Sequence, residues 1–319
     1  MPFQPAAHDG VAHCFSPGLL AFEHRPANAS AATNTNVLIW VGGLGDGLLT
    51  VPYPTAIASK LPPNWILAQP LLSSSYAGWG TSSLVRDADE LAQCVKYFRE
   101  RRGPGAKIVV MGHSTGCQDA IEYVSSPSDP SAAASRTPLD AVILQAPASD
   151  RQAMLQSLGK ASFDAANDVA RQYVEDGRGE DVLPFRVTEK DFKKTPISAR
   201  RWLALASPDK KGADDFFSDD LPDESLKKTF GAVPKGLGVC VLYSGSDEFC
   251  PSSVDKGGLV RRWSGFVKEA GGVWEEEFGG VVPGATHNLK GSSETVVSDL
   301  CRRVVGFLQK VEKGEAAHL

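Results

Sequence analysis

The sequence lacks the features that mark membrane-spanning, secreted and disulfide-linked proteins. No run of about eighteen or more apolar residues occurs, so we expect no membrane-spanning helix and no membrane partner. Residues 1–15 have neither the basic start nor the apolar stretch of a secretory signal, and we therefore expect a cytoplasmic protein. The six cysteines are scattered without a C-x-x-C pair, so we interpret most of them as buried free thiols.

The sequence also lacks a strong excess of either charge. Lysine and arginine number 33 against 38 acidic residues, which gives a formal net charge of -5. A nucleic-acid partner is not expected, because binding phosphates requires a basic stripe. The remaining composition, 42% hydrophobic and 22% charged over 319 residues, is ordinary for a globular protein with a large core.

Short apolar runs alternate with helical patterns along the chain. Four of the runs are rich in β-branched residues and nearly continuous in hydrophobicity, as expected for parallel strands covered on both faces. Apolar residues at three- and four-residue spacing predict helices over 84–100 and 293–311. This alternation predicts an α/β fold with a mostly parallel, doubly wound sheet. The predicted strands are 36–41, 64–69, 107–112, 141–146, 238–245 and 273–278.

Residues 149–236 interrupt this alternation with several helical patterns and no convincing strand. We predict that this segment is a helical cap inserted into a core formed by residues 1–148 and 237–319. Such a cap would cover the carboxyl ends of the strands, where open α/β sheets bind ligands. The alternative is a disordered insertion, which the aromatic residues Trp202, Phe216 and Phe217 argue against.

A G-x-S-x-G element formed by Gly112, Ser114 and Gly116 follows a predicted strand directly and precedes a helical pattern. A sharp strand-to-helix turn in this context exposes a serine hydroxyl above the sheet as a nucleophile. The motif alone is weak, and the alternative is a structural turn. The context favours Ser114 as a catalytic nucleophile.

A serine hydroxyl needs a base, and His287 is the best placed of the six histidines. It lies in a loop after the last predicted strand and before the last predicted helix. The other histidines precede the predicted core strands, occupy the elbow itself or lie in the terminal tail: His8, His13, His24, His113 and His318. We expect the ring of His113 to point away from the serine. A loop-capping or core role for His287 is the alternative.

The acid that orients the histidine should follow a strand between Ser114 and His287. Asp247 lies just past the predicted strand 238–245 and could accept the imidazole N–H. Glu248 is the rival, and a turn-capping role for Asp247 is the alternative. The order serine, aspartate, histidine is the one that α/β-hydrolase-type elbows use.

The glycine-rich loop 41–47 is the candidate for an oxyanion hole. The backbone N–H of Thr115 would supply one donor and that of Leu44 the second. A phosphate-binding loop is the alternative, but no Lys-Ser/Thr pair follows the glycines. Asp46 lies beside this loop, and a local turn hydrogen bond is its simplest role.

Five segments together resemble the fungal α/β-hydrolases grouped as domain of unknown function 1749. That family includes esterases that hydrolyse the ester bonds of fusarinine C and its triacetylated form. The resemblance implies the α/β-hydrolase fold, an intracellular esterase acting on an imported iron chelate, and catalytic roles for Ser114, Asp247 and His287. The segments are GGLGDGLLTVPY (42–53), SSSYAGWGTSSL (73–84), GHSTGCQD (112–119), SGSDEFCP (244–251) and GATHNL (284–289).

A ferric trihydroxamate is bulky and nearly neutral, so its site should be wide, with few charges and some aromatic surface. Tyr76, Trp79 and Trp202 could supply that surface, or they could belong to the core. We expect the acidic run 213–225 to be a solvated helix or loop face, with no metal site, because it lacks EF-hand-like spacing.

The sequence therefore predicts a serine hydrolase that acts on a small-molecule ester without a cofactor, and the family resemblance implies more specifically a siderophore esterase. One alternative keeps the chemistry and changes the substrate, giving a general carboxylesterase, lipase or thioesterase. Another is a binding protein of the same fold that recognises a ligand without turning it over.

Overall fold

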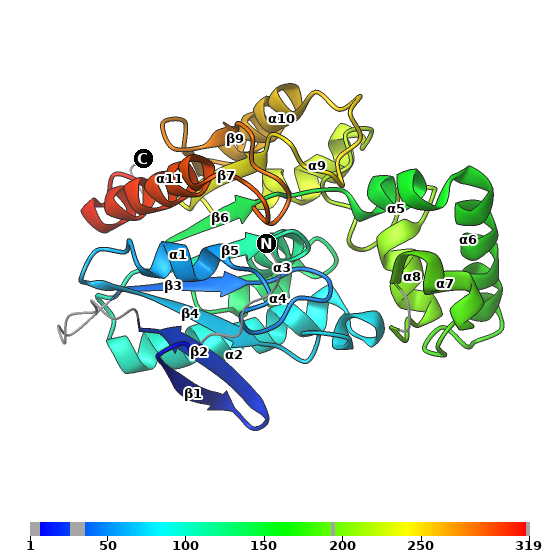
Figure 1. The fold of residues 1–319 in the computed structure, drawn as a ribbon, viewed down its shortest axis with the longest axis horizontal. Helices are drawn as coiled ribbons and strands as arrows, with labels where there is room; N and C mark the ends of the chain where they lie inside the picture. The colour runs from blue at the N-terminus through cyan, green and yellow to red at the C-terminus, as the bar shows by residue number, and fades with distance from the viewer. Residues whose placement is uncertain (1–6, 26–35, 193–194, 317–319) are drawn as a thin grey trace.

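The computed structural model describes residues 7–25, 36–192 and 195–316, and its centre is a nine-stranded sheet (Figure 1). The strands are β1 (Gly10–Ser16), β2 (Leu19–His24), β3 (Asn36–Val41), β4 (Trp65–Leu71), β5 (Ile108–His113), β6 (Ala141–Gln145), β7 (Gly238–Ser244), β8 (Val273–Trp274) and β9 (Gly280–Val282). Their order is β1-β2-β4-β3-β5-β6-β7-β8, and β9 also pairs with β7. β1 and β2 run antiparallel to their neighbours, whereas β3 to β9 pair in parallel.

The predicted parallel sheet is confirmed, and five predicted runs coincide with β3 to β7 within a few residues. The last run, 273–278, was too long, since only its first two residues form a strand, β8, and β9 begins beyond it at Gly280. The sequence did not predict β1 and β2, which contain His13 and His24. That hairpin forms one edge of the sheet and alternates exposed with buried residues, so it has no continuous apolar run.

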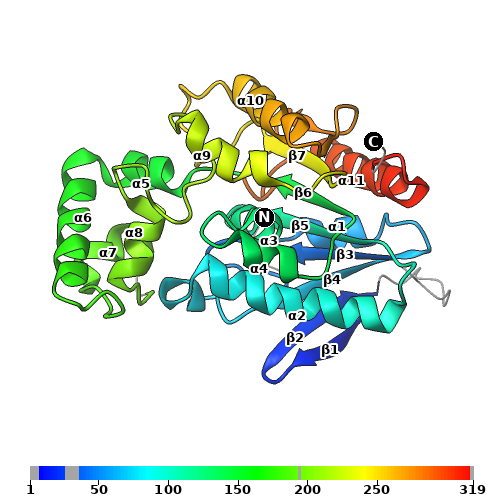
Figure 2. The same cartoon turned by 180° about the vertical axis from the view of Figure 1, so that it is seen from behind.

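Helices cover both faces of the sheet (Figures 1 and 2). α1 (Tyr53–Ala58) and α11 (Glu294–Lys313) pack on the face that carries Leu38 and Trp40. α2 (Leu84–Arg102), α3 (Gly116–Ser125) and α10 (Lys256–Glu269) pack on the face that carries Val37 and Ile39. Successive side chains of a strand point to opposite faces, so β3 alone contributes to two separate hydrophobic cores. The short helix α4 (Pro130–Ser135) follows α3.

The long helix α2 shows how local sequence signals set an element. The side chain of Ser83 accepts a hydrogen bond from the backbone N–H of Arg86 and caps the amino end. Leu84, Leu91 and other apolar residues at helical spacing are buried against the sheet. The helix ends at Gly103, whose φ of 92° lies in the region that favours glycine. The predicted helix 84–100 is therefore confirmed, with two further residues at its carboxyl end.

Four helices between β6 and β7 form a lobe beyond the carboxyl ends of the strands (Figure 1). They surround their own hydrophobic cluster, which includes Phe163, Trp202 and Leu205. We call α5 (Asp150–Leu158), α6 (Lys160–Glu175), α7 (Phe185–Phe192) and α8 (Ala199–Ala206) the helical lobe. α9 (Asp223–Lys228) and the 3-10 helix η2 (Phe230–Ala232) follow it and pack with α10 against the sheet. The division into core and cap as separate units stays a prediction.

The expectation that the acidic run 213–225 is a solvated face holds for part of it only: Asp219, Asp220, Asp223 and Glu224 are exposed, but two other carboxylates are not. The side chain of Asp214 is buried and lies 2.5 Å from the guanidinium of Arg201. Asp215 is equally enclosed and lies 2.6 Å from Arg151. Arginine partners elsewhere in the chain allow these carboxylates to be buried, which the run's own composition cannot reveal.

The structure confirms the state of the cysteines: all six are free, and five of them are buried, with Cys14 exposed. In the part of the chain that the structure describes, no helix is both long and apolar enough to cross a membrane.

Candidate active site

The G-x-S-x-G segment forms a strained turn between β5 and α3. Ser114 has a φ of 53°, a conformation that costs a residue with a side chain about 1–3 kcal/mol. Its backbone N–H donates a hydrogen bond of 3.0 Å to the carbonyl of Gln145 on β6, which helps to hold the turn. A Cβ at Gly112 would collide with the backbone of Gly116, and one at Gly116 would collide with that of Val41. The turn therefore requires both glycines.

His287 lies in the loop between β9 and α11, and two carboxylates fix it. Its Nδ1 lies 2.9 and 3.0 Å from the carboxylate oxygens of Asp247, whose side chain is fully buried. The backbone N–H of His287 donates to the carboxylate of Glu248 at 2.8 Å. The rivals from the sequence thus have different partners, since Asp247 faces the ring and Glu248 holds the backbone. An Nδ1–H donated to Asp247 leaves Nε2 as the free base.

Ser114 and His287 line one pocket of about 570 Å³, which residues of the helical lobe also line. This volume is in the range of sites for small organic ligands. The core contributes Leu44, Gly45, Asp46, Trp79, His113, Ser114, Phe249, His287 and Asn288, and the chain from β6 through the lobe contributes Ala148, Ser149, Asp150, Ala153, Met154, Ser157, Lys190, Phe192 and Thr195.

The loop after β3 approaches the serine so closely that it needs a glycine. A Cβ on Gly43 would lie 2.6 Å from Cβ and 3.0 Å from Oγ of Ser114. Among the described residues, the backbone N–H groups of Leu44 and Thr115 have no hydrogen-bond acceptor. Two free donors near the serine are what an oxyanion hole requires.

Asp46 folds this loop back on itself. Its Oδ2 accepts a hydrogen bond of 2.9 Å from the backbone N–H of Gly43, and its Oδ1 accepts one of 3.2 Å from Thr50. Burial raises the pKa of Asp46, while these two hydrogen bonds and the nearby His287 oppose the rise. The turn bond expected from the sequence is therefore present, and it fixes the backbone just before Leu44.

His113, the residue before the serine, is buried and uncharged. Burial, with His287 as a lesser cause, lowers the pKa of His113 to about 3. Its Nδ1 lies 2.6 Å from the amide oxygen of Gln145, and its Nε2 lies 3.7 Å from Asp46. Its ring stacks on Trp40, with the ring centre 5.0 Å from that of His287. His113 thus forms a neutral wall of the pocket.

Gln145, at the end of β6, joins the elements of the site, and the sequence did not single it out. Its amide oxygen also accepts a hydrogen bond of 2.8 Å from the hydroxyl of Tyr53. Its amide nitrogen donates to Ser244 at 3.1 Å and to the carbonyl of His287 at 3.2 Å. A single buried amide therefore connects the loops that carry the serine and the histidine. A glutamine inside an apolar run was the only local signal.

Of the three aromatic residues predicted to line the site, only Trp79 does so. It lies on the 3-10 helix η1 (Gly78–Thr81) and packs edge-on against Phe192 of the lobe. The prediction for Trp202 was wrong, because its side chain is fully buried in the lobe cluster. Tyr76 does not line the pocket either, since it is half exposed and its hydroxyl accepts the N–H of Leu48. Burial of an isolated aromatic residue depends on tertiary packing, which spacing in the sequence does not specify.

Two charged side chains of the pocket were not singled out from the sequence. Asp150 begins α5, and Lys190 lies on α7. Phe249 contributes a further ring, edge-on to that of His287 with centres 4.8 Å apart. In the described ranges, no group of three or more His, Cys, Asp or Glu side chains could hold a metal ion.

Comparisons with known proteins place this geometry in a family. Residues 1–309 match the family described as "protein of unknown function (DUF1749)". The chain is 38% identical to an esterase of Emericella nidulans, over 95% of this chain and 93% of that protein. It is 36% identical to the fusarinine C esterase sidJ of Aspergillus fumigatus, over 95% of this chain and 96% of that protein. The resemblance inferred from the sequence segments is confirmed.

The solved structures confirm the predicted α/β-hydrolase fold. The siderophore hydrolase EstB of Aspergillus fumigatus superposes with a TM-score of 0.83 and 34% identity, covering 97% of this chain and 99% of that one. A monoglyceride lipase of Saccharomyces cerevisiae superposes with a TM-score of 0.61 at 13% identity, covering 97% and 98% of the two chains. The second likeness concerns the fold alone.

Proposed function

The chain belongs to the family described as protein of unknown function (DUF1749), and on that premise we propose that it is a serine esterase of a hydroxamate siderophore. Its substrate is an ester of the fusarinine C type, cleaved inside the cell to release iron. The observation that carries the proposal is one pocket lined by a strained serine, a histidine held by a buried aspartate, and Leu44, whose backbone N–H is free, as is that of Thr115 directly after the serine.

The mechanism follows from the positions of these groups. Ser114 Oγ attacks the ester carbonyl while His287 Nε2 takes its proton, and the N–H groups of Leu44 and Thr115 bind the oxyanion. Asp247 stabilises the imidazolium, which then protonates the leaving alkoxide as the C–O bond breaks. A water molecule, deprotonated by His287, hydrolyses the acyl-enzyme and restores Ser114. Every proton moves between named groups, so no cofactor is needed.

The substrate class rests on the pocket and on the relatives. A pocket of about 570 Å³, lined mostly by uncharged side chains, has room for a bulky chelate. Two similar proteins are named for activity on siderophores, one of them on fusarinine C. A general carboxylesterase, lipase or thioesterase is the second candidate, because the pocket also has an apolar wall formed by Met154, Phe192 and Phe249.

Hydrolysis of two ferric siderophores tests the proposal. Purified protein is incubated with ferric fusarinine C and ferric triacetylfusarinine C, and ester cleavage is followed by mass spectrometry. We expect linear fragments from at least one of them. Hydrolysis of p-nitrophenyl acetate without cleavage of either siderophore would favour the general esterase. Tight binding of a siderophore without turnover of any ester would instead indicate a binding protein.

A further inference from the structure

The pocket contains a carboxylate that the hydrolytic mechanism does not use. Asp150 is the first residue of α5, which begins the lobe, and it lines the pocket together with Ser114 and His287. Ala153 and Met154, one turn further along α5, line the same wall. Residues at this spacing share one side of a helix, so α5 presents that side to the substrate.

The orientation of Asp150 is fixed by the core. Its Oδ2 accepts a hydrogen bond of 2.8 Å from the amide nitrogen of Gln118, whose side chain is buried on α3, the helix that follows the serine. Within the described chain, the other carboxylate oxygen of Asp150, Oδ1, accepts no hydrogen bond. Oδ1 is also not one of the buried polar atoms that lack a partner. One oxygen is thus tethered, and the other remains available to a ligand.

The charged groups around Asp150 do not neutralise it. Among the cationic groups that act on Asp150, Arg201 of α8 has the largest effect, but Arg201 is bound to Asp214 at 2.5 Å. Asp214 and Asp215 add negative charge, while His287 adds positive charge only when protonated. Burial, followed by Asp214, raises the pKa of Asp150 to about 7. Lys190 also lines the pocket, but its ammonium donates to the carbonyl of Leu158 at 2.8 Å.

We propose that Asp150 is a specificity-determining residue that binds a protonated amine on the substrate and so selects esters with a free amine over their N-acylated forms. This inference rests on the proposed esterase function and deepens it. An ammonium N–H would donate to Oδ1 and supply the positive charge that the surrounding protein does not provide. An acylated amine is neutral, so it would leave the carboxylate uncompensated when the substrate excludes water.

The proposal has a pH signature, because binding an ammonium ion requires the ionised carboxylate. As the pH falls below about 7, Asp150 takes up a proton and preference for the amine-bearing ester declines. At higher pH the substrate amine loses its own proton, so preference declines again. Loss of His287 as the base slows the cleavage of both esters, so this effect on turnover cancels in their ratio.

The experiment compares two substrates that differ at the amines, which are free in ferric fusarinine C and acetylated in ferric triacetylfusarinine C. We measure the ratio of their kcat/KM values from pH 5 to 8 for the wild type, Asp150→Asn and Asp168→Asn. Asp168 is an exposed aspartate of the same lobe, paired with Arg171, and serves as the matched control. In the wild type we expect a ratio above one that falls on the acid side of pH 7.

In Asp150→Asn we expect this ratio to fall by about ten- to hundredfold, as for the loss of a hydrogen bond to a charged group. The ratio should also no longer decrease as the pH falls below 7. Asp168→Asn should keep the wild-type ratio. The wild-type profile alone tests the proposal if Asp150→Asn fails to fold. The proposal would be overturned if the wild-type ratio did not change between pH 5 and 7, or if Asp150→Asn lowered kcat/KM equally for both substrates. If the wild type cleaves neither siderophore, the proposed function fails as well, whereas equal cleavage of both overturns only this inference.

Discussion

At the scale of single residues, the site depends on two neighbouring carboxylates with separate tasks. Asp247 accepts from the ring of His287, whereas Glu248 accepts from its backbone N–H. In the proposed mechanism, the first contact sets the tautomer of the base and stabilises the imidazolium, and the second places the loop. Adjacent acidic residues in a sequence can therefore contribute to catalysis to very different degrees.

Substitution separates the two tasks. We expect Asp247→Asn to lower kcat by about 10⁴-fold, because an amide does not stabilise the imidazolium and favours the wrong tautomer. Glu248→Gln keeps an oxygen that accepts the N–H of His287, so we expect a loss of less than about tenfold. Steady-state hydrolysis of p-nitrophenyl acetate measures both variants. A larger loss in Glu248→Gln than in Asp247→Asn would reverse the assignment.

Ser114, Asp247 and His287 could be proposed from the sequence because each follows a strand in a local pattern. Asp150 and Gln145 could not, since their importance arises from groups more than thirty residues away that folding brings to them, Gln118 and His113. The role of Asp46 lies between these cases, because its partner Gly43 is nearby in the chain. Its loop bond was expected, but its closeness to the serine was not.

At the scale of elements, the loop between β3 and α1 is built to hold one backbone geometry. Asp46 accepts the N–H of Gly43, and its own backbone carbonyl accepts the N–H of Tyr76 at 2.7 Å. Gly43 in turn lies against Ser114. A shift of this loop would move the N–H of Leu44 relative to the developing oxyanion while leaving most of the pocket in place.

Two variants of Asp46 test this positioning role. Asp46→Ala removes the acceptor of the Gly43 N–H. We expect kcat to fall by about ten- to hundredfold, with a small change in KM. This fall in kcat is smaller than or similar to that caused by removing one oxyanion donor. Asp46→Asn keeps an acceptor oxygen and should restore most of the activity. The measurement is kcat and KM with p-nitrophenyl acetate. A change confined to KM, or equal losses in both variants, would argue against the role.

Elements buried on both faces could be predicted from the sequence, and elements that depend on distant partners could not. β3 to β7 consist of continuous apolar runs, whereas the β1–β2 hairpin alternates exposed and buried residues and lacks that signal. The acidic run was misjudged for a related reason. Asp214 and Asp215 are buried only because Arg201 and Arg151 meet them from other helices.

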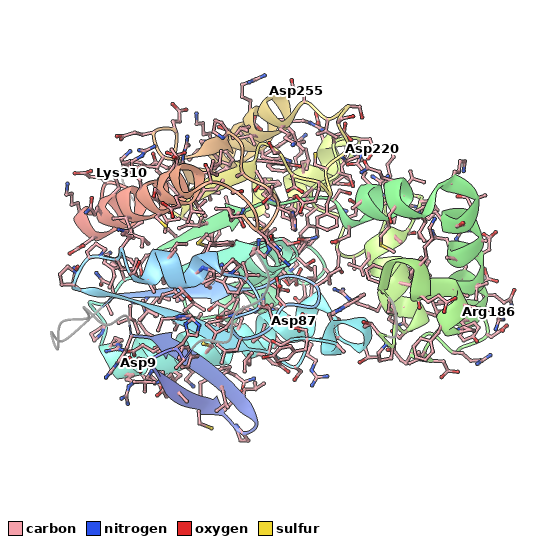
Figure 3. The ribbon with its side chains drawn as sticks, viewed as in Figure 1. Asp9, Asp87, Arg186, Asp220, Asp255 and Lys310 are labelled. Atoms are coloured by element: carbon pink, nitrogen blue, oxygen red, sulfur yellow. The ribbon has the colours of Figure 1, made fainter. Side chains whose placement is uncertain are left out.

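At the scale of the whole molecule, buried carboxylates collect where the core faces the helical lobe. Asp87, labelled in Figure 3, lies at that end of the core. Burial raises its pKa to about 6, and the nearby Glu90 adds to the rise. The folded state thus binds a proton more tightly here than the unfolded chain does. Ionisation of Asp87 therefore destabilises the folded state, and this destabilisation grows as the pH rises from about 4 to 6.

Asp87→Asn should therefore gain stability relative to the wild type as the pH rises. We expect the difference in free energy of unfolding to move in favour of the variant by about 1 kcal/mol per pH unit between pH 4 and 6, and to level off above pH 7. Urea unfolding at pH 4.5, 5.5 and 7.5 measures it. Contributions from His24 and His113 are common to both proteins and cancel. A difference that does not vary with pH would contradict this assignment.

The most direct test of the central claim is to find the residue that carries the acyl group. The protein is treated with a fluorophosphonate, which reacts with activated serines, and intact mass and peptide mapping locate the adduct. We predict one adduct, on Ser114, formed in parallel with loss of esterase activity and absent from Ser114→Ala. Loss of activity with an adduct at another residue, or full esterase activity in Ser114→Ala, would contradict the account.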